Sequence, residues 1–169
     1  MNCPSCGHEN IDGIDRCENC LAPFRQLDIP SHDAAEGMAR SVMEDNLAQL
    51  DQDQTVAVTS KTPALEVARL MKNANTGCAL VIDDGKLVGI FTEHDILKRM
   101  TTAGDLDVTA VRELMSPNPD TLHENASVAE ALNRMSMGRY RHIPVLKSDG
   151  THAVCSIKSV LKYIAQEDW

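Results

Sequence analysis

The sequence predicts an α+β protein with a small metal-binding head and two similar units of strand, helix, strand, strand and helix packed through their sheets. Three observations carry this prediction. Two CxxC pairs stand near the N-terminus, the remaining chain repeats at a fixed offset of 64 residues, and each copy alternates helix and strand periodicities. The divisions are a head at 1–24, a linker and helix at 25–50, a first unit at 51–105 and a second at 106–169.

Composition limits the class of protein. The 169 residues are 43% hydrophobic but only 3% aromatic, so the cores must be aliphatic. No apolar run approaches the roughly 18 residues of a membrane span, and the N-terminus lacks the order of a secretory signal. We therefore expect a soluble, cytoplasmic protein with reduced cysteines and no membrane partner. A net charge of −9 disfavours nucleic acid as a partner.

The cysteine head, residues 1–24, has the spacing of a metal site. Cys3 and Cys6 form one CxxC pair, and Cys17 and Cys20 form the other, ten residues later. Four thiolates complete a closed tetrahedral shell, which leaves no position open for catalysis. The segment has too few apolar side chains to order itself, so metal binding must supply the missing free energy.

The stretch Cys3-Pro4-Ser5-Cys6-Gly7 resembles the start of small zinc ribbons. That resemblance implies a structural Zn²⁺, although Leu21 stands where the family usually has a second glycine. Iron held as in rubredoxin is the alternative. His8 is expected to face solvent because four thiolates already suffice. Acidic side chains dominate the head, which favours a protein partner over DNA.

The connection after the head is predicted to end at Pro30 and to lead into a helix over residues 31–50. Ser31 or Asp33 is available as a cap for this helix. Its apolar side chains recur at spacings of three and four residues: Met38, Val42, Met43, Leu47 and Leu50.

The internal repeat relates the two units without a gap. Five identities hold at the offset of 64, pairing Glu66, Met71, Val81, Leu97 and Lys98 with Glu130, Met135, Val145, Leu161 and Lys162. A unit of about 50 residues buries too little surface to stand alone. The two copies are therefore expected to pack against each other.

Local signals place the same elements in both copies. In the first, Thr62 caps and Pro63 starts a helix, and strands at 78–82 and 87–91 flank an Asp84-Gly85 turn before a second helix from Glu93. In the second, Ser127 and Glu130 form a capping box for a helix through Met135. Strands at 142–146 and 153–155 and a helix at 158–165 follow. Cys78 and Cys155 lie on apolar strands and are predicted core residues.

Residues 83–97 and 140–145 resemble the two signature segments of tandem CBS (cystathionine-β-synthase) domains, the Bateman module. They read Asp83-Asp84-Gly85-Lys86-Leu87-Val88-Gly89-Ile90-Phe91-Thr92-Glu93-His94-Asp95-Ile96-Leu97 and Tyr140-Arg141-His142-Ile143-Pro144-Val145. The resemblance covers about residues 35–167. It implies clefts between the copies that hold an adenosine nucleotide, namely AMP, ADP, ATP or S-adenosylmethionine, and a homodimer formed through the CBS domains.

The resemblance also implies site residues. Thr92 and Asp95 match the family's Ser/Thr-x-x-Asp, which holds ribose hydroxyls; the alternative is a helix-capping pair. The second copy offers Ser156 but has Ser159 in place of the carboxylate. The adenine-side threonine is Thr121 in the second copy, whereas the first has Ala57.

The remaining contacts implied by the family come from both copies. Adenine is expected against the backbone of Gly77, Cys78 and Ala79. Phosphate is expected at Arg141 and His142, with Arg139 in reach. The alternative for these cations is surface salt bridges in an acidic protein.

These features together predict a regulatory protein and not an enzyme, since no phosphate-binding loop, HExxH helix or GxSxG elbow is present. Nucleotide binding would change the arrangement of the copies, and the zinc ribbon would signal to a protein partner. Two alternatives stay open. One is a structural or dimerisation module with empty clefts, and the other is a transcription-associated factor acting through the ribbon.

Overall fold

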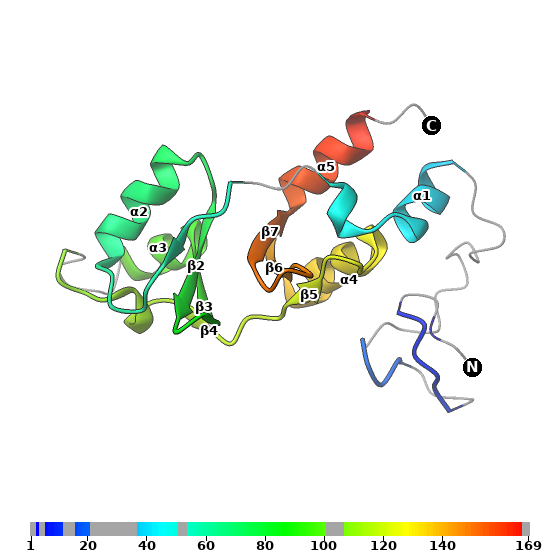
Figure 1. The fold of residues 1–169 in the computed structure, drawn as a ribbon, viewed down its shortest axis with the longest axis horizontal. Coiled ribbons are helices and arrows are strands. Elements are labelled where there is room, and N and C mark those ends of the chain that lie inside the picture. The colour runs from blue at the N-terminus through cyan, green and yellow to red at the C-terminus, as the bar shows by residue number, and fades with distance from the viewer. Residues whose placement is uncertain are drawn as a thin grey trace. The chain divides into compact units, whose positions relative to one another are not determined.

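The computed structural model describes residues 3, 6–11, 16–20, 37–50, 54–100 and 107–166. They divide into two compact units. Unit 1 contains the cysteine head, α1, η2, α4 and α5, and unit 2 contains β1–β7 with α2, α3 and η3. Figure 1 labels the five α-helices and the strands from β2 to β7. Within this part of the chain, no helix has the length and apolarity that a membrane crossing requires.

The helical elements are α1 (Met38–Glu44), η2 (Leu47–Gln49), α2 (Ala64–Asn73), α3 (Glu93–Met100), η3 (Val111–Glu113), α4 (Val128–Gly138) and α5 (Ile157–Gln166). The strands are β1 (Ala57–Val58), β2 (Cys78–Asp83), β3 (Lys86–Thr92), β4 (Ser116–Pro117), β5 (Leu122–His123), β6 (His142–Leu146) and β7 (His152–Ser156). Each copy thus runs strand, helix, strand, strand, helix, and the α+β prediction is confirmed.

The first copy builds a four-stranded sheet in the order β1-β2-β3-β4. β1 runs parallel to β2, whereas β2 and β3 are antiparallel. The turn between them is the predicted Asp84-Gly85 pair, at φ angles of 49° and 75°. Two successive positive φ values are those of a type I′ turn, whose twist matches that of a hairpin.

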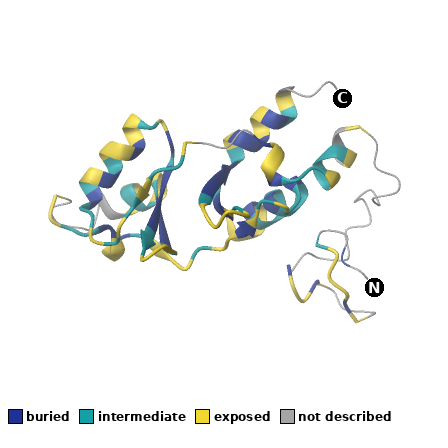
Figure 2. Ribbon diagram, in the orientation of Figure 1, coloured by how far each residue is buried: buried dark blue, intermediate teal, exposed yellow. Residues whose placement is uncertain are grey.

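Alternation along β2 and β3 gives this sheet two apolar faces. Ala79, Val81 and Phe91 pack on one face with residues of α2 and η3. Cys78, Leu80 and Ile90 form a second buried cluster with Val154 of β7. Figure 2 shows the buried residues concentrated on these strands. Val154 belongs to the sheet of the second copy and packs against the sheet of the first, as predicted.

The second sheet, in the order β5-β6-β7, repeats the pairing of the first at the sequence offset of 64. Cys78 pairs with Thr92, and His142 pairs with Ser156. The two registers part after Val81, where a β-bulge shifts the pairing in the first copy. The second hairpin instead closes through Asp149, whose Oδ1 accepts hydrogen bonds from the N–H (2.8 Å) and Oγ1 (2.6 Å) of Thr151.

In unit 1, the segment before the first copy lies on the second. The N–H of Leu47 donates to the carbonyl of Ala126 (3.0 Å), and the N–H of Val128 donates to that of Asp45 (3.0 Å). The Tyr163 hydroxyl on α5 donates a short hydrogen bond to the Asp45 carboxylate. These contacts fix the end of α1 and η2 onto elements more than 70 residues later in the chain.

Three local predictions need correction. The helix predicted over residues 31–50 is divided into α1 and η2, and its proposed caps Ser31 and Asp33 lie outside the described residues. Thr62 does not cap α2; Pro63 is the N-cap residue and makes no side-chain cap hydrogen bond. The capping box at α4 is half formed, because Ser127 accepts from the Glu130 N–H (3.1 Å) while the Glu130 carboxylate meets Arg134 (3.5 Å).

Candidate functional site

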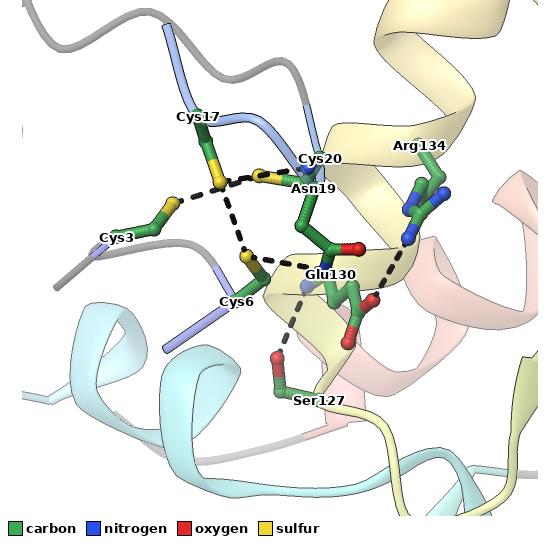
Figure 3. Close-up of polar contacts among 8 residues, drawn as sticks. All are labelled: Cys3, Cys6, Cys17, Asn19, Cys20, Ser127, Glu130 and Arg134. Atoms are coloured by element: carbon green, nitrogen blue, oxygen red, sulfur yellow. Dashed lines mark hydrogen bonds and ion pairs between the residues drawn. The ribbon is translucent and has the colours of Figure 1, made fainter. Parts of the chain in front are cut away.

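The four head cysteines converge as their spacing predicts (Figure 3). Their Sγ atoms lie within 4.8 Å of one another. The closest pairs join the two CxxC turns, with Cys3 and Cys20 at 3.5 Å and Cys6 and Cys17 at 3.6 Å. Four sulfurs held about 2.3 Å from one tetrahedral ion are about 3.8 Å apart, so these residues fit a metal.

Backbone turns and two asparagines hold the cysteines in place. The Gly7 N–H donates to the Cys3 carbonyl (2.8 Å), which closes the first turn. Asn10 is buried, donates to the His8 carbonyl (2.7 Å) and accepts from the Glu18 N–H (2.9 Å). Asn10 therefore ties one CxxC turn to the other. No spacing rule marks such a residue, and the sequence analysis missed it.

The sulfur of Cys17 is stabilised as a thiolate. Burial raises its pKa, but hydrogen bonds from the Cys20 and Asn19 N–H groups and contacts with Cys6 and Cys20 outweigh burial and lower the pKa to about 6. Asn19 Nδ2 also donates to Cys6 Sγ (3.7 Å). His8 is exposed and is not one of the clustered ligands, as predicted.

Thr92 and Asp95 meet where β3 passes into α3. Asp95 Oδ2 accepts hydrogen bonds from the Thr92 N–H (2.9 Å) and Oγ1 (2.8 Å), and the Asp95 N–H approaches Thr92 Oγ1 at 3.4 Å. This is the capping geometry that was the alternative to ribose binding. Both bonds use Oδ2, and Oδ1 has no hydrogen-bond partner among the described residues.

Gly77 brings the two copies together beside this pair. A Cβ placed on Gly77 would lie 2.8 Å from Nε2 of His142 and 3.4 Å from the carboxyl carbon of Glu93. The imidazole from the second copy thus rests directly on the Gly77 backbone, next to Glu93. The Glu93 N–H also donates to the Gly77 carbonyl (3.1 Å). Of the predicted adenine and phosphate residues, Gly77 and His142 are therefore in contact.

The other predicted residues have different surroundings. Cys78, Ala79 and Ser156 are buried, and Cys155 is also buried, so both strand cysteines are core residues as predicted. Arg139 and Arg141 are exposed residues of unit 1. Arg139 ends α4 in the left-handed conformation, and the Arg141 carbonyl accepts from the Ile157 N–H (2.9 Å).

Thr121 lines an open pocket of about 500 Å³ in unit 2. The pocket is formed by Gly85, Lys86, Leu87, Asn118, Pro119, Thr121, Leu146, Gly150 and His152. It shares no residue with the cluster at Gly77, and the Thr121 hydroxyl donates to the Pro119 carbonyl (3.1 Å). Neither Thr92 nor Asp95 lines the pocket at Thr121.

Comparison with known proteins decides the family. The model of the CBS domain matches this chain twice, at residues 39–102 and 111–166. The chain belongs to the CBS-domain family. Its two copies are CBS repeats, and the pairing of their sheets described above is the architecture of a tandem CBS pair.

Relatives in curated collections share this region. An uncharacterized 17.7 kDa protein of Acidianus ambivalens is 30% identical over 122 residues, covering 71% of this chain and 73% of that protein. The CBS domain-containing protein CBSCBSPB3 of Arabidopsis thaliana is 27% identical over 106 residues, covering 62% of this chain. The chain spans only 19% of that plant protein's length.

Solved structures have the same fold. A conserved protein from Pyrococcus horikoshii is 26% identical with a TM-score of 0.66, covering 75% of this chain and 96% of its own. The CBS domain pair of protein MJ0100, in complex with 5′-methylthioadenosine and S-adenosyl-L-methionine, is 21% identical with a TM-score of 0.65, covering 73% and 98%. A CBS domain protein of Pyrobaculum aerophilum complexed with AMP is 22% identical with a TM-score of 0.62, covering 73% and 100%.

Proposed function

We propose that this protein is a regulatory sensor that binds an adenosine-containing ligand between its CBS repeats and passes the change to a protein partner. The observation that carries the proposal is the start of α3, where Asp95 keeps one carboxylate oxygen, Oδ1, without a hydrogen-bond partner among the described residues. At the same helix start, Glu93 and His142 meet over Gly77. The AMP complex and the methylthioadenosine and S-adenosylmethionine complex of other CBS proteins support the ligand class.

Ribose recognition follows from the chemistry of this carboxylate. A cis-diol presents two O–H donors, and a carboxylate oxygen that is not already engaged can accept from them. Thr92 holds Asp95 through Oδ2, which fixes the carboxylate on the helix terminus while Oδ1 remains available. In this proposal the capping pair and the ribose contact are compatible, because they use different oxygens.

For the head, we propose a structural Zn²⁺ held by Cys3, Cys6, Cys17 and Cys20. The four sulfurs form a closed shell of the kind that zinc ribbons use, and the described part of the head offers little other buried material. Zinc would supply folding free energy and no chemistry. The ordered head is then available to contact a protein partner.

The test of the sensing proposal is isothermal calorimetry of the full chain against AMP, ADP, ATP, 5′-methylthioadenosine and S-adenosylmethionine. At least one should bind, and Asp95→Ala should abolish binding without changing the thermal unfolding of the free protein by more than a cap's contribution, about 1 kcal/mol. Glu113→Ala is the matched control, since it removes an exposed carboxylate of the same unit. Full retention of affinity in Asp95→Ala would reject the ribose contact.

A dimerisation module without ligand is the second candidate. Two observations favour it: the Thr92 to Asp95 bonds are satisfied without a ligand, and Leu97 and Leu161 are 68% and 59% exposed at equivalent positions of α3 and α5. Sedimentation of the full chain separates the candidates when combined with the calorimetric panel. A stable dimer that binds none of the five compounds would establish this second function.

A further inference from the structure

We propose that the pocket at the turn ends of the two hairpins of unit 2 is a second ligand site, which binds a small organic phosphate with an apolar body. Lys86 and His152 supply its positive charge. The proposal goes beyond adenosine sensing and does not depend on it. Neither the Thr92 and Asp95 pair nor the contact at Gly77 contributes a residue to this pocket.

The pocket lies at the opposite end of β3 from the proposed ribose contact. This strand begins with Lys86, which lines the pocket, and ends with Thr92. His152 is the first residue of β7, and Asn118 belongs to the connection between β4 and β5. All four residues belong to unit 2. The pocket is thus a separate place in the same compact unit.

The lining of the pocket carries two basic side chains and no carboxylate. The side chains of Lys86 and His152 form no ion pair or hydrogen bond with another residue that the structure describes. An ammonium group is charged at neutral pH, an imidazole offers a ring N–H in either protonation state, and the Asn118 carboxamide offers two more donors. The Thr121 hydroxyl already donates to the Pro119 carbonyl and is not counted. These donors complement the charged oxygens of a phosphate.

Four aspartates stand close to the pocket in the sequence, and none of them lines it: Asp83, Asp84, Asp120 and Asp149. Two of them are bound elsewhere. Asp83 Oδ1 accepts from the Ser60 N–H (3.0 Å), and Asp149 Oδ1 accepts from the Thr151 N–H (2.8 Å). Asp84 and Asp120 are exposed, so water and salt screen their repulsion of an anion. The positive charge of the lining is therefore left for a ligand.

The rest of the lining calls for an apolar body on the ligand. Leu87, Pro119 and Leu146 form apolar walls, and the volume of about 500 Å³ lies within the range of about 300–1,000 Å³ that small-molecule sites have. An inorganic phosphate fills only part of this space. The walls are held by the hairpins, since Leu146 pairs with His152 and the Asn118 N–H donates to the Val88 carbonyl (3.2 Å). The pocket is thus formed before a ligand arrives.

The test is a titration of the ¹⁵N-labelled full chain, followed by NMR, with three probes. Phenyl phosphate carries both the charge and the apolar body, inorganic phosphate only the charge, and phenol only the body. Phenyl phosphate should bind most tightly and should shift the amide signals of Gly85 and Gly150, which line the pocket. Inorganic phosphate should shift the same signals at higher concentration.

Variants assign the charge to its residues. Lys86→Gln and His152→Gln should each weaken phenyl phosphate by about fivefold, the effect of one charged contact at a solvated site. Lys86→Arg keeps the charge and should keep most of the affinity. Lys72→Gln is the matched control, because it removes an exposed lysine of α2 in the same unit and should change nothing. Lys86 is exposed, so its variants test the charge even if His152→Gln disturbs the hairpin.

Three outcomes overturn the proposal: shifts that avoid Gly85 and Gly150, an affinity for phenyl phosphate that Lys86→Gln leaves unchanged, and phenol binding as tightly as phenyl phosphate. Asp95→Ala separates this site from the adenosine site. It should leave phenyl phosphate binding unchanged, and a loss there would place the phosphate at α3 and also overturn the proposal. Failure of every adenosine compound to bind would reject the sensing function and leave this site standing.

Discussion

The cysteine head and the CBS repeats are held together by different interactions. In the head, the described buried cluster consists of cysteines alone, Cys3, Cys17 and Cys20 with Cys6 against them. In the first repeat, the corresponding cluster is aliphatic and aromatic, and includes Val67, Val81 and Phe91 at no more than 1% exposure. If the proposed zinc is bound, one chain combines a module that needs an ion with a module that needs only apolar burial. Each should fail under conditions that leave the other intact.

The largest expected effect is on the head. Cys17→Ser removes one of the four proposed ligands, and a structural zinc supplies about 10–16 kcal/mol of folding free energy in comparable modules. We expect the variant to lose its bound zinc, measured by plasma mass spectrometry of the purified chain, while the urea transition of the repeats stays in place. Cys78→Ala is the control, because it removes a buried thiol outside the head and should keep the metal. A shifted urea transition in Cys17→Ser would show that the head also supports the repeats.

The converse prediction is that a substitution in the core of the first repeat destabilises the repeats and leaves the head intact. Phe91 of β3 is fully buried against residues of α2 and η3, and Phe91→Ala should lower the free energy of unfolding by about 3–5 kcal/mol. Urea denaturation followed by circular dichroism measures this. The zinc content should not change. Loss of metal from this variant would mean that the head depends on the repeats, against the comparison above.

Acidification should release metal from the head at a higher pH than the one at which it destabilises the repeats. The pKa of Cys17 is lowered to about 6, so its stabilising contribution is present above the ordinary thiol range and is lost as pH falls through 6. Hydrogen bonds from Ser60 lower the pKa of Asp83, and those from Thr151 lower that of Asp149, so their contributions disappear only below about pH 4. Protons compete with the proposed metal for this thiolate, so a chromogenic chelator should report metal release as the pH falls, while circular dichroism stays constant down to about pH 4. Simultaneous loss of both signals would contradict this order.

The smallest expected effect concerns the N-terminal caps of α4 and α2. Ser127 accepts a hydrogen bond from the Glu130 N–H, whereas Thr62 makes its hydroxyl contact with Thr59 and caps nothing. Ser127→Ala should cost about 1 kcal/mol of stability, and Thr62→Ala only a few tenths, in the same urea experiment. Equal losses would mean that the cap at α4 contributes nothing specific.

Local chemistry made much of the fold predictable. Asp84-Gly85 predicts a turn because its backbone needs two positive φ values, and Ser127 predicts a helix start because its hydroxyl can accept an orphan N–H. The end of α1 was not predictable in this way. The hydrogen bond between Asp45 and Tyr163, which are 118 residues apart, helps to fix the position of α1 and η2. The apolar periodicity of residues 31–50 cannot predict a contact with a residue so distant in the chain.

The residues of the candidate sites also differ in whether local sequence signals predict them. The four cysteines follow from spacing, and Thr92 and Asp95 follow from the three-residue reach of a capping pair. The contact of His142 with Gly77 depends on how two sheets pack, and it became visible only in three dimensions. The place of Glu93 beside them was missed for the same reason, although Glu93 stands between Thr92 and Asp95 in the sequence.

The docking of α1 and η2 on the second repeat also limits how this protein can be dissected. Backbone groups at Asp45 and Leu47 are paired with Val128 and Ala126, so the second repeat is completed by residues that precede the first sheet. A fragment that begins at the boundary between the repeats would lack Asp45 and Leu47. It would leave the backbone groups of Val128 and Ala126 unpaired and expose the surface of α4 that α1 covers. Proteolysis or truncation between the repeats should therefore yield unstable fragments. The smallest fragment that we expect to fold alone contains both repeats together with residues 37–50.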